Sequence, residues 1–484
     1  MEGGAFFFLG LENSSNHAEW ALKKGVKAFL LFSNLAKDSR TLKETTQEVQ
    51  RRAQNRGIGP LIFGIDQEGG VVRRIKDPEI EFPSAFALAT LGDEGKIEEA
   101  AWLTGSYLKE HGVDINLAPV VDTLFWEEDE GIATRSFGTD AGIVAKMASA
   151  YLRGVLKAGI MGAAKHFPGH GHALKDTHSW EAEAPLDDGF AERFQRGLLP
   201  FKRLIDQGVP VVIPAHVRYG ALSDELPATF SPSLLQGLLR GGMGYRGLIV
   251  SDDLLMQAAL SPFQGDIVEA AIQAFLAGCD LLTVGPNQDM QALAIEGFTR
   301  AIRSGRVPKG RLEEAYEGLE GFFFWTVRNR ALKTHSPLPS SGKRLETARR
   351  LAQEVVRVYD PSEILPLGVS TKEAVNVIEN EESSVLSKAL IKKGLKTRSF
   401  DFDRAMKVMP EGSPFIVRLG SPPCLNKVHR FLEQFHNQKI NGAILSSGIL
   451  HHPLPNCKKW AFVFAGSLTP MVMDAALSHL FKRV

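Results

Sequence analysis

The sequence is poor in cysteine, carries no excess of either charge and has no long hydrophobic run. Three cysteines occur among 484 residues, which excludes a disulfide framework and is typical of a reducing compartment. Lys plus Arg and Asp plus Glu number 56 each, so no net field indicates a nucleic acid or an anionic membrane as partner. No run approaches the ~20 apolar residues of a membrane span. These absences predict a cytoplasmic protein that binds neither nucleic acid nor membrane.

The N-terminal segment MEGGAFFFLGLENSS contains a short apolar run over residues 5–11. A secretory signal peptide needs a basic start and a longer apolar stretch, whereas Glu2 precedes this run and no Lys or Arg does. The segment therefore indicates a buried strand rather than a leader.

Short apolar runs recur through the first two-thirds of the chain, and amphipathic helical patterns such as 42–57, 97–112 and 144–159 lie between them. The runs are continuous rather than alternating, as expected for parallel strands that are covered on both faces. This order predicts a (β/α)₈ barrel over residues 1–333, with an open doubly wound sheet as the rival. The eight predicted strands are 5–11, 26–32, 61–66, 115–122, 160–167, 209–217, 247–254 and 280–285.

A Pro- and Ser-rich stretch at 334–343 has the composition of a linker. A helical pattern at 344–359 follows, and then the strand-like runs AVNVIE, PFIVRL, GAILSS and WAFVFAG. Residues 344–484 are therefore predicted to form a second, smaller α/β domain around a parallel sheet, with a structural or regulatory role.

Polar residues close five of the eight predicted strands. In barrel enzymes the active site lies at the carboxyl ends of the strands, so these side chains are expected to face one site. They are Asp66, Asp122, Lys165 with His166, His216, and Asp252 with Asp253.

The segment KHFPGHGHALKDTH, residues 165–178, contains four histidines. One interpretation is a metal site at His170 and His172, but the adjoining glycines place this pair in a loop, and metal ligands need orienting partners from other elements. A second interpretation is proton transfer by Asp176 and His178, because an Asp that accepts a hydrogen bond from one ring nitrogen raises the basicity of the other. The third is an exposed Asp-Thr-His turn without a chemical role.

KHFPGHG followed by DTH, together with IDQEGG (65–70), RSFG (135–138), PAHV (214–217), PATFS (227–231) and VSDDLLM (250–256), resembles glycoside hydrolase family 3. Within that family the pattern is similar to the β-N-acetylglucosaminidase branch, and the matches span residues 5 to about 315. The segment 344–359 also resembles the start of the second domain in two-domain members.

The resemblance implies specific roles. Asp252 matches the nucleophile, His178 the general acid/base and Asp176 its orienting partner. Neither a metal nor another cofactor is implied. The residues that match the binding site for the non-reducing sugar are Asp66, Arg74, Arg135, Lys165 and His166.

The implied function is that of a retaining exo-β-N-acetylglucosaminidase that removes GlcNAc from small cell-wall muropeptides. A β-N-acetylglucosaminide phosphorylase and a non-catalytic muropeptide-binding protein are the alternatives. His172 and Val71 stand where the family has Asp and often Arg, so substrate range and loop behaviour stay open. Asp253 follows the nucleophile, and strand alternation gives it a structural role.

Overall fold

The computed structural model describes residues 3–12, 16–126, 131–173, 177, 181–222, 225–331 and 339–359, and shorter segments from residue 374 to residue 480. The shorter segments are 374–378, 385–392, 395–400, 415–419, 442–446, 461–464 and 469–480. Asp176, His178 and residues 334–338 of the predicted linker lie outside the described residues.

All eight predicted strand segments contribute to one parallel sheet, in the order β11-β9-β7-β6-β3-β2-β1-β12. The two ends of this sheet meet, because Val250, directly after β11, bridges in parallel to Leu281. The α/β class and the curled eight-stranded parallel sheet are thereby confirmed. The strands are β1 (Phe7–Gly10), β2 (Ala28–Leu31), β3 (Ile62–Ile65), β6 (Ile115–Asn116), β7 (Met161–Phe167), β9 (Val211–Pro214), β11 (Leu248–Ile249) and β12 (Leu282–Val284).

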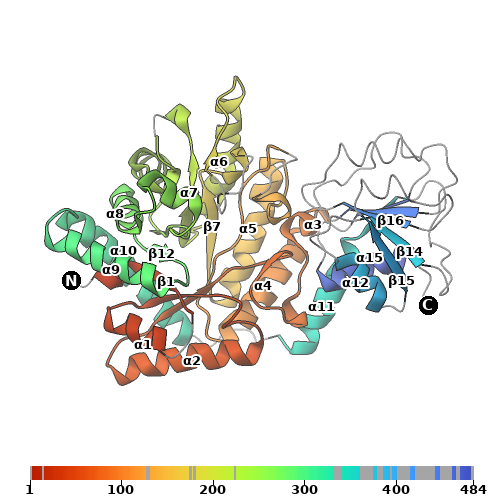
Figure 1. The fold of residues 1–484 in the computed structure, drawn as a ribbon, viewed down its shortest axis with the longest axis horizontal. Coiled ribbons are helices and arrows are strands. Elements are labelled where there is room, and N and C mark those ends of the chain that lie inside the picture. Colours follow the sequence, from red (N-terminus) through yellow and green to blue (C-terminus); the bar gives the residue numbers. More distant parts are fainter. Residues whose placement is uncertain are drawn as a thin grey trace.

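Helices alternate with these strands and cover the outside of the sheet (Figure 1). They are α1 (Asn16–Lys23), α2 (Ser39–Asn55), α3 (Ala85–Ala89), α4 (Glu94–Glu110), α5 (Ala141–Ala158), α6 (Phe190–Asp206), the π-helical η7 (Ser233–Gly242), α7 (Gln257–Leu260), α8 (Ile267–Ala277), α9 (Gln288–Arg303) and α10 (Lys309–Ala331).

Three helices begin three residues earlier than their apolar periodicity predicts. Asp38, Asp93 and Asp140 are the N-caps of α2, α4 and α5, and each carboxylate accepts a hydrogen bond from a backbone N–H of the first turn. Such a cap satisfies a donor that has no partner inside the helix. The polar first turn is therefore helical although it adds nothing to the buried face.

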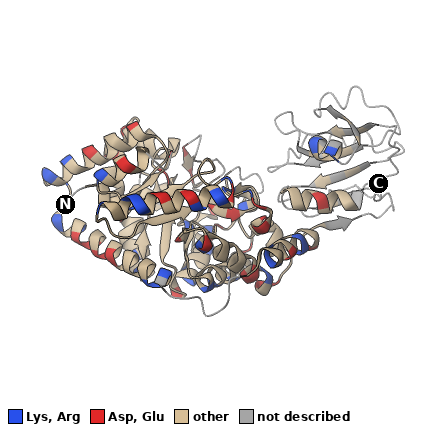
Figure 2. Ribbon diagram, turned by 90° about the horizontal axis from the view of Figure 1, so that it is seen from below, with Lys and Arg blue, Asp and Glu red and all other residues tan. Residues whose placement is uncertain are grey.

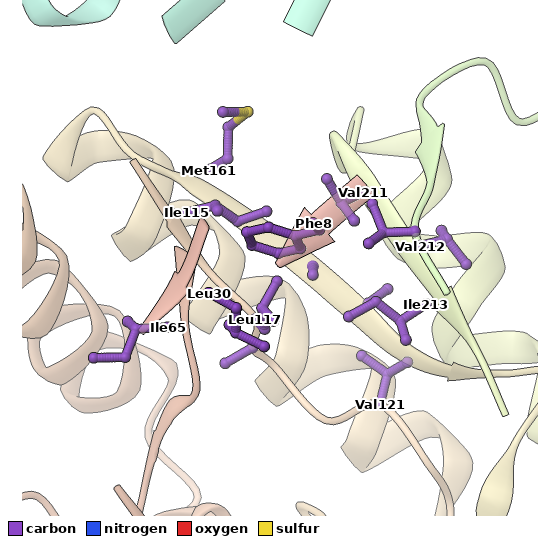
Figure 3. Close-up of a cluster of buried hydrophobic side chains, with 14 of the residues drawn as sticks. Phe8, Leu30, Ile65, Ile115, Leu117, Val121, Met161, Val211, Val212 and Ile213 are labelled. Carbon is purple, nitrogen blue, oxygen red and sulfur yellow. The ribbon is translucent and has the colours of Figure 1, made fainter. Parts of the chain in front are cut away.

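The interior of the curled sheet is filled by apolar side chains from different strands (Figure 3). Phe8 of β1 and Ile115 of β6 both pack against Gly64 of β3, where a Cβ atom would lie 2.4 Å from the Phe8 ring and 2.9 Å from Ile115. Glycine is thus required at this position by close packing. The filled interior closes the sheet below the ends of the strands and confines polar chemistry to its rim.

A second, six-stranded sheet has the order β13-β18-β17-β16-β14-β15. Four of its strands coincide with the predicted runs, namely β14 (Ala374–Ile378), β16 (Phe415–Leu419), β17 (Gly442–Ser446) and β18 (Ala461–Phe464). The sequence did not predict β15 (Lys396–Phe400). The helices near this sheet are α11 (Ser341–Glu354), α12 (Val385–Lys392) and α15 (Pro470–Leu480).

Two local predictions for this part of the chain are wrong. Residues 341–343 belong to α11 rather than to the linker, because the Ser340 side chain caps the helix by accepting from the Lys343 N–H. The predicted helix 344–359 ends at Glu354, and its valine-rich end forms β13 (Arg357–Tyr359). This strand pairs antiparallel with β18, so the sheet is mixed rather than parallel. The division of the chain into two domains stays a prediction.

Ion pairs connect helix α11 to α4 and to Glu79, which lies in the segment before α3. Arg344 donates to Glu79 at 2.7 Å and to Glu110 at 3.1 Å, and Arg350 donates to Glu99 at 2.7 Å. Along the helices of the ribbon, segments coloured for basic and for acidic residues are interspersed (Figure 2). Within the described part of the chain, no helix has the length and apolar character needed to cross a bilayer.

Candidate active site

The predicted polar residues meet at the carboxyl-end rim of the curled sheet. Asp66 follows β3, Lys165 and His166 lie at the end of β7, and Asp252 follows β11. Because parallel strands all point their carboxyl ends at one rim, residues far apart in sequence converge there.

Lys165 is the centre of a buried charge cluster. Its Nζ atom lies 2.9 Å from Oδ1 of Asp66 and 2.7 Å from Oε1 of Glu68, and its side chain is 5% exposed. Burial opposes the charge on Lys165, but the two carboxylates outweigh it and raise the pKa of this ammonium group. The lysine is therefore a fixed cation.

Two arginines complete the cluster. Arg135, at the end of η3 (Ala133–Arg135), holds Glu68 with a two-pronged contact, Nε to Oε2 and Nη2 to Oε1, each at 2.9 Å. Arg74 reaches Oδ2 of Asp66 at 3.3 Å. Burial opposes ionisation of Glu68, yet Arg135 and Lys165 hold its pKa well below the usual range. The rim thus presents fixed donors and acceptors of the kind that bind sugar hydroxyls.

Asp122 is a fully buried carboxylate that organises β7 and the loop after it. It accepts from the backbone N–H of His166 at 3.1 Å and from that of His170 at 2.7 Å, and it bonds the Nδ1 atom of His166 at 2.8 Å. Although burial raises the pKa of Asp122, these partners lower it overall. The bond at Nδ1 fixes the orientation of the His166 ring and leaves Nε2 directed toward Asp252.

Asp252 is the site carboxylate that remains accessible. Its side chain is 30% exposed, and its Oδ2 atom lies 3.8 Å from Nε2 of His166, while Oδ1 accepts from the N–H of Asp253 at 2.8 Å. Burial raises the pKa of Asp252, but attraction to His166, His216 and Lys165 lowers it to about 2. The group is therefore an ionised carboxylate at neutral pH, held in place without a direct contact to a Lys or Arg in its described surroundings.

Asp253 has its carboxylate occupied by backbone. Its Oδ1 atom accepts from the N–H of Leu255 at 3.0 Å and from that of Gly285 at 2.8 Å. These bonds tie the segment after β11 to the segment after β12, so the side chain stabilises the rim.

The two residues on either side of Thr177, Asp176 and His178, are the predicted proton-transfer pair and lie outside the described residues. Thr177 itself is described and buried. Its hydroxyl shares a hydrogen bond of 3.2 Å with Nε2 of His170, and its carbonyl accepts from the N–H of Ala258 at 3.3 Å.

The two departures from the family pattern have different surroundings. Val71 is 67% exposed at the turn between two short strands, β4 (Gln67–Gly69) and β5 (Val72–Arg73). His172 is buried and stacks on Phe125 with ring centroids 4.7 Å apart. Neither of its ring nitrogens has a hydrogen-bond partner among the described residues, and burial lowers its pKa to about 4. His172 is a packing residue in this structure.

Sequence reasoning placed Asp122 and His216 at the ends of strands facing the site but gave them no specific role, and it did not single out Glu68. Glu68 carried one signal, because it lies two residues after Asp66 in IDQEGG. His216 bonds Thr229 through Nδ1 at 2.8 Å and the carbonyl of Asp253 through Nε2 at 3.2 Å. These partners come from other segments, which the sequence does not pair. Among the described residues, no group of three His, Cys, Asp or Glu side chains is arranged to hold a metal ion.

Comparison with known proteins decides the family. Residues 5–319 match the Glycosyl hydrolase family 3 N terminal domain. The chain belongs to glycoside hydrolase family 3. Over 271 residues it is 37% identical to a β-hexosaminidase of Actinobacillus succinogenes, an alignment that covers 54% of this chain and 75% of that protein. The predicted family and enzyme class are confirmed: this is a glycoside hydrolase related to the β-hexosaminidases.

Solved structures extend the likeness to the whole chain. A family 3 β-N-acetylglucosaminidase from Paenibacillus sp. str. FPU-7 superposes with a TM-score of 0.80 at 25% identity, over 98% of this chain and 95% of that one. A β-glucoside phosphorylase, BglX, superposes with a TM-score of 0.78 over 100% of this chain and 92% of that chain. At 19% identity the second likeness shows the fold alone.

Proposed function

We propose that this family 3 enzyme is a retaining exo-β-N-acetylglucosaminidase in which Asp252 is the nucleophile. The observation that carries the proposal is the state of Asp252, an ionised and partly exposed carboxylate beside a rim of fixed sugar-binding groups. The other described carboxylates of the rim are held more closely: cations lie within 3.3 Å of Asp66 and Glu68, His166 lies 2.8 Å from Asp122, and backbone N–H groups occupy Asp253.

The chemistry proceeds in two displacements. The Asp252 carboxylate attacks the anomeric carbon, the bond from that carbon to the leaving oxygen breaks, and His178 donates a proton to this oxygen. His178 then removes a proton from water, which attacks the same carbon and frees Asp252. Asp176 orients His178 and favours its protonated form. The anomeric carbon thus exchanges its glycosidic bond for a hydroxyl group from water, and its configuration is retained.

The non-reducing sugar is bound by Asp66, Arg74, Arg135, Lys165 and His166. Lys165 and the arginines donate to hydroxyls, and Asp66 accepts from them. Fixed ion pairs hold these donors in place before substrate arrives, so little ordering is needed on binding. These residues are presented by the (β/α)₈ barrel of the family. The curled sheet, whose two ends are bridged, supports this fold.

The natural substrate we propose is a small GlcNAc-terminated cell-wall muropeptide. The resemblance of KHFPGHG and DTH to the β-N-acetylglucosaminidase branch supports this choice, as do the β-hexosaminidase relatives. The candidate substrates are compared by measuring turnover of 4-nitrophenyl N-acetyl-β-glucosaminide, a GlcNAc–anhydromuramyl disaccharide and N,N′-diacetylchitobiose. Running it with and without phosphate distinguishes hydrolysis from phosphorolysis.

The decisive experiment traps the nucleophile. A slow fluorinated N-acetylglucosaminide is expected to form an ester at Asp252, which peptide mass spectrometry locates. Label on Asp253 or Glu68 would show that the nucleophile assignment is wrong. Product released as the α-anomer, followed by NMR during the first turnovers, would contradict the retaining mechanism.

A further inference from the structure

Thr177 is attached to two different elements near the rim. Its hydroxyl shares the 3.2 Å hydrogen bond with Nε2 of His170, and its carbonyl accepts from the N–H of Ala258, the second residue of α7. The residue is 3% exposed. Two hydrogen bonds from one buried residue, one through the side chain and one through the backbone, fix both its position and its orientation.

The attachment through His170 leads to the nucleophile. The N–H of His170 donates to Asp122 at 2.7 Å, and the same carboxylate bonds Nδ1 of His166 at 2.8 Å. Nε2 of His166 lies 3.8 Å from Asp252. One buried carboxylate thus connects the group that holds Thr177 with the group that faces Asp252.

The hydrogen bond to Ala258 also connects Thr177 to Asp252, in this case along the polypeptide chain. The segment that carries Asp252 turns directly into α7, with the N–H of Met256 donating to the carbonyl of Asp253 at 3.0 Å. Ala258 follows Asp252 by six residues. Both hydrogen bonds of Thr177 therefore connect it, through intervening residues, to the segment that carries Asp252.

Thr177 stands between Asp176 and His178 in sequence. Consecutive Cα atoms are about 3.8 Å apart, so fixing Thr177 limits the positions open to the residues on either side. We propose that Thr177 is a positioning residue for the acid/base step, which sets the reach of His178 to the leaving oxygen opposite Asp252. This inference rests on the proposed function, because it takes His178 as the acid/base.

The test uses the full chain with Thr177→Val, which keeps the shape and removes the hydroxyl, and Thr177→Ser, which keeps the hydroxyl. The value of kcat/KM is measured on N,N′-diacetylchitobiose, whose leaving group needs a proton, and on the 2,4-dinitrophenyl glycoside, whose leaving group does not. Since a misplacement of about 1 Å can cost ~10²-fold, Thr177→Val is expected to lose about 10- to 100-fold on the disaccharide. We expect less than about 3-fold loss on the activated glycoside and near-normal rates for Thr177→Ser.

Equal losses of Thr177→Val on both substrates, or no loss on either, would overturn the inference. His178→Ala is measured in the same series, so the two proposals fail separately. If His178→Ala shows no dependence on the leaving group, the acid/base assignment itself is wrong. If His178→Ala shows that dependence and Thr177→Val does not, only the positioning role of Thr177 is wrong. Circular dichroism and thermal unfolding of each variant check that the fold is retained.

Discussion

The Nε2 atom of His166 lies 3.8 Å from Oδ2 of Asp252, while the Nδ1 atom of the same ring is bonded to buried Asp122. The histidine thus stands between two carboxylates of different kinds. Asp122 is fully buried and orients the ring, whereas Asp252 is 30% exposed and ionised. This arrangement separates the structural carboxylate from the reactive one.

Adjacent aspartates are expected to respond in opposite ways to substitution. Asp252→Ala should lower kcat/KM by at least about 10³-fold with little change in stability, because it removes the nucleophile. Asp253→Ala should instead lower the free energy of unfolding by about 1–3 kcal/mol, since it leaves the N–H groups of Leu255 and Gly285 without their acceptor. Turnover on 4-nitrophenyl N-acetyl-β-glucosaminide and urea unfolding measure the two effects. Loss of turnover in a fully folded Asp253→Ala would contradict this division.

His178→Ala is expected to lose about 10²- to 10⁴-fold on a disaccharide, the usual worth of general acid/base catalysis. The loss should be smaller on the 4-nitrophenyl glycoside, because nitrophenolate leaves without a proton. Asp176→Ala should lose a smaller factor and lower the pKa of the basic limb of the rate profile, since its charge no longer favours the imidazolium. Near-normal disaccharide cleavage by His178→Ala would mean that His178 is not the acid/base.

Burial of His172 predicts an acid-sensitive contribution to stability. Its folded pKa of about 4 lies below the ordinary histidine value of ~6.5, so between these pH values the unfolded state binds the extra proton. Stability therefore falls as pH is lowered, by about 2 kcal/mol between pH 7 and pH 5 from this group. Asp122 and Arg193 are the charged groups that act on it. In His172→Leu this part of the pH dependence, measured by denaturant unfolding at both pH values, should disappear; an unchanged dependence would contradict the prediction.

Lys165→Met should destabilise the fold by about 1–3 kcal/mol, because Asp66 and Glu68 lose their shared cation while each keeps an arginine partner. Adding Asp66→Asn should restore part of that loss, so the double variant should lose less than the two single variants together. Lys165→Arg is the matched control that keeps the charge. Strict additivity in urea unfolding would show that Asp66 and Lys165 do not stabilise one another.

Activity is expected to survive exhaustive treatment with a chelator, because displacement by Asp252 requires no cation. Inactivation by the chelator that is reversed by zinc would revive the interpretation of His170 and His172 as metal ligands. Assaying the same enzyme after dialysis back into untreated buffer controls for loss of folded protein.

The eight strand segments were predictable because each is a short apolar run that stays buried whichever neighbours it pairs with. Helix starts were less predictable, since the caps Asp38, Asp93 and Asp140 extend each helix into a polar turn. The end of α11 was mispredicted for a different reason. Residues 357–359 leave the helix to pair with β18, a partner that lies about 100 residues further along the chain.

The sequence by itself determined the alternation of strands and helices, the polar residues that close the strands, and the motifs that carry the family resemblance. These are local properties of the chain. Only the tertiary structure decided that Glu68 shares Lys165 with Asp66, that Asp122 orients His166, and that Thr177 is held beside the segment of Asp252. The physical reason is that the role of a charged group or a hydroxyl depends on the groups with which it forms ion pairs and hydrogen bonds. These partners come from strands and loops as many as 99 residues apart, which the curled sheet brings to one rim.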